Sequence, residues 1–196
     1  MAEEKVRADA RRNRQRVLDA AEAVLARDGL TASMRTVAAE AGVGLGTIYR
    51  HFPTQEALYQ AIILTRTERL AAEAGELGNR LEPGPAFFAY FRRIVDSAAE
   101  KKALSDVVAS AGLDPKEGLA DVSRAMRDAI ETLLVRAQRA KAVRDDVRMP
   151  DVLALLSAAC LGAERQRWSP ELTGRTLAFL FDGLRPTGPA DLPTAL

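Results

Sequence analysis

The side chains best suited to a binding reaction lie close together in residues 45–51, LGTIYRH. This run combines a guanidinium, two hydroxyls and an imidazole with a glycine. A guanidinium can donate two hydrogen bonds to a guanine edge, a threonine methyl can contact thymine, and a glycine allows the backbone to come close to a ligand. These residue types therefore suit recognition of base edges in a nucleic-acid groove.

Groups for covalent or metal chemistry are scarce by comparison. The one cysteine, Cys160, excludes an internal disulfide, and the one histidine, His51, excludes a metal site built on a histidine pair. We therefore expect no metal and no cofactor, and we interpret Cys160 as a small buried hydrophobe. An enzyme would need a nucleophile, base or metal constellation, and the sequence offers none.

Two short helices and a tight turn, residues 33–52, would hold the polar run in place. Ser33 can cap the first helix, and Gly42 can adopt the left-handed conformation that ends it. In the second helix, Ile48 and Phe52 lie four residues apart on the inner side, which leaves the polar side chains outward. The first helix buries a single face, which consists of Met34, Val37, Ala38 and Ala41.

Residues 37–58, VAAEAGVGLGTIYRHFPTQEAL, resemble the DNA-binding signature of the tetracycline-repressor (TetR) family of bacterial regulators. The spacing by itself would also fit an ordinary helical hairpin, and the resemblance favours a DNA-binding motif. It covers about residues 12–70. Two positions depart from the family pattern: Gly44 replaces a usual serine and weakens the helix cap, and Gln55 replaces a lysine that usually contacts a phosphate.

The resemblance also implies where individual residues of the motif would meet DNA. Tyr49 and His51 would contact phosphates, and Ser33 and Arg35 would flank them. Gly46 would lie where the backbone approaches the duplex. The residues near base edges would be Leu45, Thr47 and Arg50.

Composition and charge are compatible with this interpretation. The 196 residues include 47% hydrophobic side chains, which is enough for one or two small domains with a packed core. Residues 1–52 hold nine Lys/Arg against seven Asp/Glu, and the remainder holds 19 against 20, so the N-terminal part has the expected positive sign. No segment resembles a signal peptide and no apolar run approaches the ~20 residues of a membrane span, so we expect a cytoplasmic protein.

An N-terminal domain of three helices, residues 10–70, is expected around the motif. After a polar arm, its first helix ends at Asp28-Gly29 and buries a face made of Val17, Leu18, Ala21, Val24 and Leu25. A basic cluster at the start of this helix fits either a solvated surface or phosphate contacts. The cluster consists of Arg11, Arg12, Arg14 and Arg16.

A second helical domain, residues 71–185, should bind an effector and form the dimer. A helix starting at Thr54 would reach about Gly75, and Gly78 with residues 83–85, PGP, predicts a loop. Further helical patterns occupy residues 87–98, 103–111 and 119–137, the last opened by Asp114-Pro115. No alternating pattern indicates a strand, so the predicted fold class is all-α.

A cavity for an apolar small molecule is expected inside this second domain. Aromatic and flexible side chains on its helices could line the cavity, although most such stripes form a filled core. The sequence does not identify the effector. The candidate lining residues are Phe88, Phe91, Val95, Met126, Ile130 and Trp168.

Two apolar helices near the C-terminus predict a homodimer interface, which the family resemblance also implies. Residues 152–163, VLALLSAACLGA, hold one polar side chain, and the next helix also exceeds a single apolar stripe. A helix that is apolar all round must be covered on every face, in part by a second subunit. The candidate interface residues are Leu153, Leu156, Cys160, Leu177, Leu180 and Phe181. Residues 186–196 contain three prolines and are expected to be disordered.

These features together predict a one-component transcriptional regulator that binds a near-palindromic double-stranded DNA operator. Repression relieved by a small-molecule effector is the favoured mode of action. Two other classes stay open: a helical protein-interaction module without DNA binding, and an all-α enzyme that binds a small molecule. The interaction module would explain the apolar C-terminal helices but not the helix-turn-helix motif.

Overall fold

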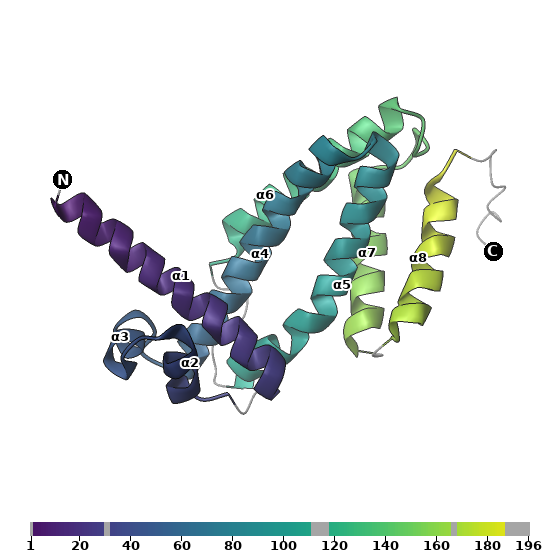
Figure 1. Ribbon diagram of the computed structural model, residues 1–196. Helices are drawn as coiled ribbons and strands as arrows, with labels where there is room; N and C mark the ends of the chain where they lie inside the picture. Colours follow the sequence, from purple (N-terminus) through teal and green to yellow (C-terminus); the bar gives the residue numbers. More distant parts are fainter. Residues whose placement is uncertain (1, 30–31, 111–117, 166–167, 187–196) are drawn as a thin grey trace. The chain divides into compact units, whose positions relative to one another are not determined.

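The computed structural model describes residues 2–29, 32–110, 118–165 and 168–186, in which helices are the regular elements (Figure 1). These residues contain no strand, so the predicted all-α class is confirmed. None of their helices is long and apolar enough to cross a membrane. The helices are α1 (Ala2–Asp28), α2 (Met34–Ala41), α3 (Leu45–His51), α4 (Gln55–Arg80), α5 (Pro83–Ser110), α6 (Ala120–Arg139), α7 (Met149–Arg165) and α8 (Pro170–Leu184).

Two compact units divide the chain. The N-terminal unit consists of Met1–Arg66 and Ala103–Leu119, and the body unit consists of Thr67–Lys102 and Ala120–Leu196. Because α4 and α5 are continuous helices, each contributes residues to both units. The sequence predicted two contiguous domains and did not anticipate that part of α5 would join the N-terminal unit. The tail predicted to be disordered lies outside the described residues from residue 187 onward.

The N-terminal unit has one apolar core. Ile48 and Phe52 of the motif join it, and so do Leu104 and Val108 of α5. The predicted face of α1 is buried in the same core through Val17, Leu18, Ala21 and Val24. However, α1 begins at Ala2, so the prediction of a polar arm before this helix is wrong. That segment is rich in Ala, Glu, Lys and Arg, which favour helix.

The turn between α2 and α3 depends on how α2 is closed at its two ends. Ser33 caps the helix, since its Oγ accepts a hydrogen bond from the Thr36 N–H at 3.1 Å. At the other end, Gly42 adopts a left-handed φ of 63° and donates its N–H to carbonyls of α2. Arg16 of α1 donates from Nη2 to the Ala41 carbonyl at 2.8 Å. Both predicted boundaries of α2 are thereby confirmed.

In the body unit, α4 continues through the glycines where a loop was predicted. It ends at Arg80 rather than near Gly75. Gly78 is buried against α6: an added Cβ would lie 2.7 Å from Arg136 Nη1, and the Gly78 carbonyl accepts from Arg136 Nη2 at 2.8 Å. The missing side chain lets the two helices pack closely, and this contact offsets the roughly 1 kcal/mol that glycine costs within a helix.

The boundaries predicted for α5 are also wrong. The helix begins at Pro83, so the expected Pro-Gly-Pro loop is a first helical turn, where proline is favoured. It then runs to Ser110 without the break that the sequence analysis placed before residue 103. The predicted start of the next helix at Asp114-Pro115 lies outside the described residues.

The core of the body unit is built by side chains from all five helices α4 to α8. Rings of α5 and α8 meet at its edge, where the Phe181 centroid lies 4.7 Å from that of Phe88 and 5.4 Å from that of Phe91. Apolar positions of the helical patterns predicted at residues 87–98 and 119–137 are buried here and include Phe87, Phe91, Val95, Ile130, Leu133 and Ala137.

Candidate nucleic-acid interface

Two apolar anchors fix α3 on its inner side. Ile48 is fully buried, and Phe52, which follows the helix directly, is also buried. Gly44 is the N-cap residue and forms no side-chain hydrogen bond there, as expected from a position without a serine. Because the helix has only seven residues, these two anchors determine which of its sides faces outward.

The other side of α3 presents the residues that the sequence analysis singled out. Tyr49 is 48% exposed, and Gly46 and Arg50 are exposed as well. Leu45, Thr47 and His51 are half-buried, and Leu45 also packs against the apolar core. One short helix therefore carries a guanidinium, two hydroxyls and an imidazole on or near the protein surface.

Gly46 has no packing role inside the N-terminal unit. A Cβ added to it would meet no neighbouring atom within 4 Å, and its backbone is not left-handed. Glycine within a helix is destabilising by roughly 0.5–1 kcal/mol relative to alanine. The open space at this position leaves room for an external partner to approach the backbone of α3 closely.

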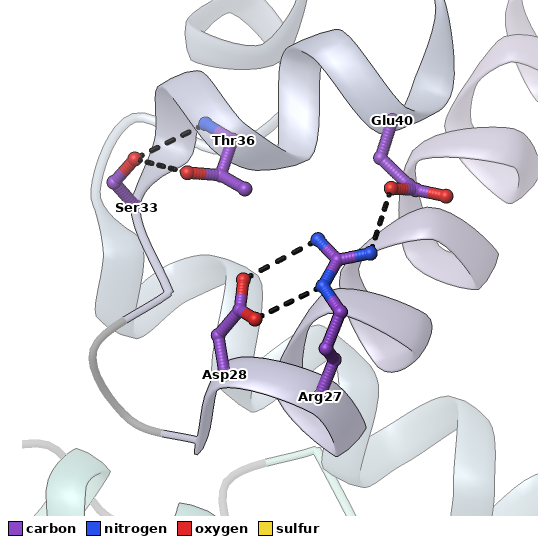
Figure 2. Close-up of polar contacts among 5 residues, drawn as sticks. All are labelled: Arg27, Asp28, Ser33, Thr36 and Glu40. Atoms are coloured by element: carbon purple, nitrogen blue, oxygen red, sulfur yellow. Dashed lines mark hydrogen bonds and ion pairs between the residues drawn. The ribbon is translucent and has the colours of Figure 1, made fainter.

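The two residues predicted to flank phosphates lie at the start of α2. The Ser33 Oγ accepts a hydrogen bond from the Thr36 N–H at 3.1 Å and lies 2.8 Å from the Thr36 Oγ1 (Figure 2). The Ser33 hydroxyl is therefore already engaged as a helix cap. Arg35 is exposed, and no acidic residue lies in the first turn of α2.

Acidic groups near the motif are compensated within the N-terminal unit. Arg27 Nε lies 2.9 Å from Asp28 Oδ1, and Arg27 Nη1 lies 3.2 Å from Glu40 Oε2 (Figure 2). The hydrogen bond to Asp28, followed by that to Glu40, raises the pKa of Arg27 above its usual value. One guanidinium thus reduces the repulsion that two carboxylates would exert on a polyanion.

Two arginines of α1 hold that helix against the motif. The Arg14 guanidinium carbon lies 5.3 Å from the centroid of the Phe52 ring, a cation–π contact, and Arg16 donates to the Ala41 carbonyl. The basic cluster predicted solvent or phosphate as the partner of these cations. The internal contacts have no local signal, because each partner is distant in sequence. The Arg11 side chain lies outside the described residues.

Gln55 has a role that its departure from the family pattern did not reveal. Its Nε2 donates to the Ala32 carbonyl at 2.7 Å and to Tyr59 Oη at 2.5 Å. The side chain thereby ties the segment before α2 to the start of α4. A position where a lysine would contact phosphate is used here for an internal contact between segments 23 residues apart.

Comparisons with known proteins cover both units. Residues 17–62 match the family described as bacterial regulatory proteins, tetR family. Residues 82–186, more than half of the chain, match the C-terminal domain of SbtR-like transcriptional regulators. The chain belongs to the TetR family of transcriptional regulators. TetR-family membership gives it an N-terminal DNA-binding domain and excludes the enzyme that the sequence analysis had left open.

Individual TetR-family proteins are similar over different lengths. A TetR transcription regulatory protein from Mycobacterium vanbaalenii is 38% identical with a TM-score of 0.74, over 92% of this chain and 99% of that chain. A TetR transcriptional regulator from Streptomyces coelicolor is 35% identical with a TM-score of 0.71, over 89% and 99%. The HTH-type transcriptional regulator UidR of Escherichia coli (strain K12) is 39% identical over 69 residues, which span only 35% of either chain.

The residues predicted to line an effector pocket are dispersed in the body unit. A narrow apolar gap, too small to hold a water molecule, lies between α5, α6 and α7 and is lined by Phe87, Tyr90, Phe91, Ile94, Ile130 and Leu156. It includes Phe91 and Ile130 of the predicted set. The other four predicted residues do not line it: Phe88, Val95, Met126 and Trp168. Periodicity located the buried side of α5 but could not separate filled space from the gap.

The residues predicted to form a dimer interface divide between core and surface. Leu156 and Leu177 are buried in the core of their own body unit, which corrects their placement in an interface. The half-buried members of the predicted set are Leu153, Cys160, Leu180 and Phe181. The large apolar side chains that α7 and α8 expose are Leu161, Leu172 and Phe179. They belong to the apolar runs that predicted the interface but are not among the candidate residues. Both helices are apolar on several sides, so periodicity did not tell inner positions from outer ones.

Titratable side chains do not gather into a metal centre in the part of the chain that the structure describes. No group of three or more His, Cys, Asp or Glu side chains there could hold a metal ion. Cys160 is half-buried in α7 and forms no disulfide, and His51 lies at the end of α3.

Proposed function

We propose that this TetR-family regulator is a repressor that binds a near-palindromic operator as a homodimer and leaves it when a small molecule enters the body unit. The observation that carries the proposal is the exposed side of α3, where exposed Tyr49 and Arg50 follow buried Ile48. A short helix that is fixed by buried anchors and exposes hydrogen-bond donors suits the major groove.

Each exposed group of α3 suits a particular contact with DNA. Arg50 would read a guanine edge, and Thr47 and Leu45 would offer apolar contacts to thymine methyl groups. Gly46 would let the backbone approach the duplex, which accounts for a glycine that the fold does not need. Tyr49 would contact a phosphate.

The remaining contacts would anchor the motif on the DNA backbone. His51 at the end of α3 and Arg35 at the start of α2 would face phosphates, as Coulomb attraction favours. Ser33 would act through the helix terminus that it caps, because its own hydroxyl already accepts the Thr36 N–H.

A homodimer would place two copies of α3 on the operator. In the proposed interface, the exposed side chains of α7 and α8 pack against their symmetry mates, led by Phe179, which is 76% exposed. Burial of this ring against a partner would remove a large apolar area from water. Two recognition helices about 34–36 Å apart could read half-sites one duplex turn apart.

Titration of DNA with the purified chain tests the proposal. A duplex from the intergenic region upstream of its own gene is compared with a shuffled duplex of equal composition, each over a series of salt concentrations. We expect tighter binding to the natural duplex and a steep loss of affinity as salt rises. Equal affinity for the two duplexes would contradict an operator there, and absence of DNA binding by a dimeric chain would favour the protein-interaction module.

Arg124→Ala supplies a control for nonspecific effects of charge. Arg124 lies on α6 in the body unit with 74% of its side chain exposed, so removal of its charge should leave operator binding unchanged. Repression itself is tested in cells with a reporter placed behind the bound duplex. Its expression should rise when the regulator is deleted, and a fall would indicate an activator.

A further inference from the structure

Tyr90 of α5 carries a buried hydroxyl without a hydrogen-bond partner in the described part of the structure. Its side chain is 1% exposed, so bulk water does not reach it. A buried polar group of this kind costs stability, and phenylalanine would fill nearly the same space without that cost. By contrast, the other buried tyrosine, Tyr59, accepts a hydrogen bond from Gln55.

The same tyrosine lines the apolar gap of the body unit. Five of the six lining residues are Phe, Ile or Leu, and the Tyr90 hydroxyl is the one polar side-chain group among them. The gap is a narrow crevice in which no water molecule has room, so a water does not satisfy the hydroxyl from that side. An apolar lining with a single unpaired polar group is the composition of a small-molecule site.

The Tyr90 hydroxyl has a proton to donate, because a phenol is protonated at neutral pH. Burial, followed by the negative charge of Glu73, raises the pKa of Tyr90 further, to about 12. Glu73 itself is bound by Arg93, whose Nε lies 2.8 Å from Glu73 Oε2. A nearby carboxylate and an apolar lining both disfavour an anionic ligand.

We infer that the gap is a ligand site in which Tyr90 Oη donates a hydrogen bond to a neutral acceptor, such as a carbonyl oxygen, on a compact apolar molecule. The inference rests on the proposed regulation by an effector and specifies the chemistry of that effector. The lining side chains must move apart to admit it. Binding then gives the hydroxyl the partner that it lacks in the free protein.

Two ring compounds of matched shape test this inference on the full chain. Cyclohexanone carries a carbonyl oxygen where methylenecyclohexane carries a CH₂ group, so they differ in the acceptor and little in size. Ligand binding raises the midpoint of thermal unfolding, and titration of the shift gives the affinity. We expect the ketone to bind about tenfold more tightly than the alkene, as one neutral hydrogen bond predicts.

Tyr90→Phe and Tyr59→Phe form a matched pair of variants. In Tyr90→Phe the preference for the ketone should disappear, and the unliganded protein should unfold at a higher temperature than wild type. In Tyr59→Phe the preference should persist, and the unfolding temperature should fall because Gln55 loses a partner. Any of three results would overturn the inference. These are failure of the ketone to bind the wild-type protein, a preference for the ketone that survives in Tyr90→Phe, and a Tyr90→Phe protein that is less stable than wild type.

Operator titration in the presence of cyclohexanone separates this inference from the proposed function. Tyr90-dependent binding of the ketone without any change in operator affinity would support the site and argue against regulation through it. An operator released by other compounds in the Tyr90→Phe variant as readily as in wild type would support regulation and overturn the role of Tyr90.

Discussion

The residues of α3 have two roles. Some hold the helix against the apolar core, and others are exposed and available to contact a partner. Ile48 is fully buried, whereas Arg50, two positions later, is exposed. The difference follows from the helical period, which turns successive side chains by about 100° and so separates neighbours onto different sides. Substitutions on the exposed side should therefore change binding without unfolding the protein.

Arg50→Ala should weaken binding to the operator more than binding to random DNA. Loss of a bidentate contact to guanine would remove ~1–3 kcal/mol of discrimination. Competition titrations with operator and shuffled duplexes measure this difference. Arg35→Ala is the matched change at the start of α2 and should reduce both affinities alike, because phosphates carry no sequence information. An equal loss in Arg50→Ala would assign Arg50 to the phosphates as well.

Gly46→Ala should stabilise the protein and impair DNA binding. The added methyl meets no neighbouring atom within 4 Å, so the helix should gain roughly 0.5–1 kcal/mol of stability. The same methyl would collide with a closely approaching duplex. Urea unfolding and operator titration measure the two effects. Gly75 lies in α4, where an added Cβ also has open space. Gly75→Ala should therefore raise stability without impairing DNA binding.

Tyr90 should weaken the wild-type protein at alkaline pH. Its pKa is raised from 10.0 to about 12 on folding, first because burial disfavours the phenolate, so the free energy of unfolding is unaffected by this group below pH 10 and falls as pH rises from 10 through 12. The full loss amounts to about 2–3 kcal/mol. Urea unfolding at a series of pH values should show a steeper decline for wild type than for Tyr90→Phe across this window. Parallel curves would show that the phenol titrates normally.

At the scale of elements, the turn of the motif depends on glycines with different tasks. Gly42 is left-handed at φ 63°, which a side chain makes costly, whereas Gly44 has an ordinary φ of −68° and merely lacks a capping group. Arg16 reinforces the first of these positions through the Ala41 carbonyl. The orientation of α3 therefore follows from α1 and α2 as much as from its own residues.

Serine substitutions at these two glycines should have opposite effects on stability. Gly42→Ser should cost about 1 kcal/mol because the left-handed backbone becomes strained. Gly44→Ser should add a few tenths of a kcal/mol, since its Oγ can accept an N–H from the first turn of α3. Chemical denaturation of both variants measures the two changes in the free energy of unfolding. A destabilised Gly44→Ser protein would mean that the N-cap geometry cannot accommodate the hydroxyl.

At the scale of the whole molecule, α7 and α8 expose apolar side chains that no other part of the single subunit covers in the described structure. Phe179→Arg should convert the proposed dimer into monomers and lower operator affinity strongly, because two half-sites would no longer be held together. The fold should survive, since Phe179 is largely exposed in one subunit. Sedimentation and operator titration test both expectations.

Two further variants define the interface more closely. Val135→Arg introduces the same charge at an exposed position of α6 and should leave the dimer intact. Leu156→Arg buries a charge in the subunit core and should unfold the body unit instead of separating subunits. A dimeric Phe179→Arg protein with normal operator binding would place the interface elsewhere.

The sequence by itself determined the two short helices and the turn of residues 33–52, because the signals that bound them are local. The cap at Ser33 and the left-handed Gly42 act on neighbouring residues of α2, and Ile48 and Phe52 lie four positions apart on the same side of the motif. Local spacing also identified the buried sides of α1, α5 and α6. Helical periodicity is sufficient for these features since each depends on neighbours three or four positions away.

Only the tertiary structure decided features whose partners are distant in the chain. Gly78 is helical because Arg136 packs against it, and Gln55 is an internal tie because it meets the Ala32 carbonyl. The sequence likewise could not show that Leu156 faces inward while Phe179 faces outward, since both lie on helices that are apolar on several sides. These roles follow from close packing between helices that are separate in the chain, and a local sequence pattern does not indicate that packing.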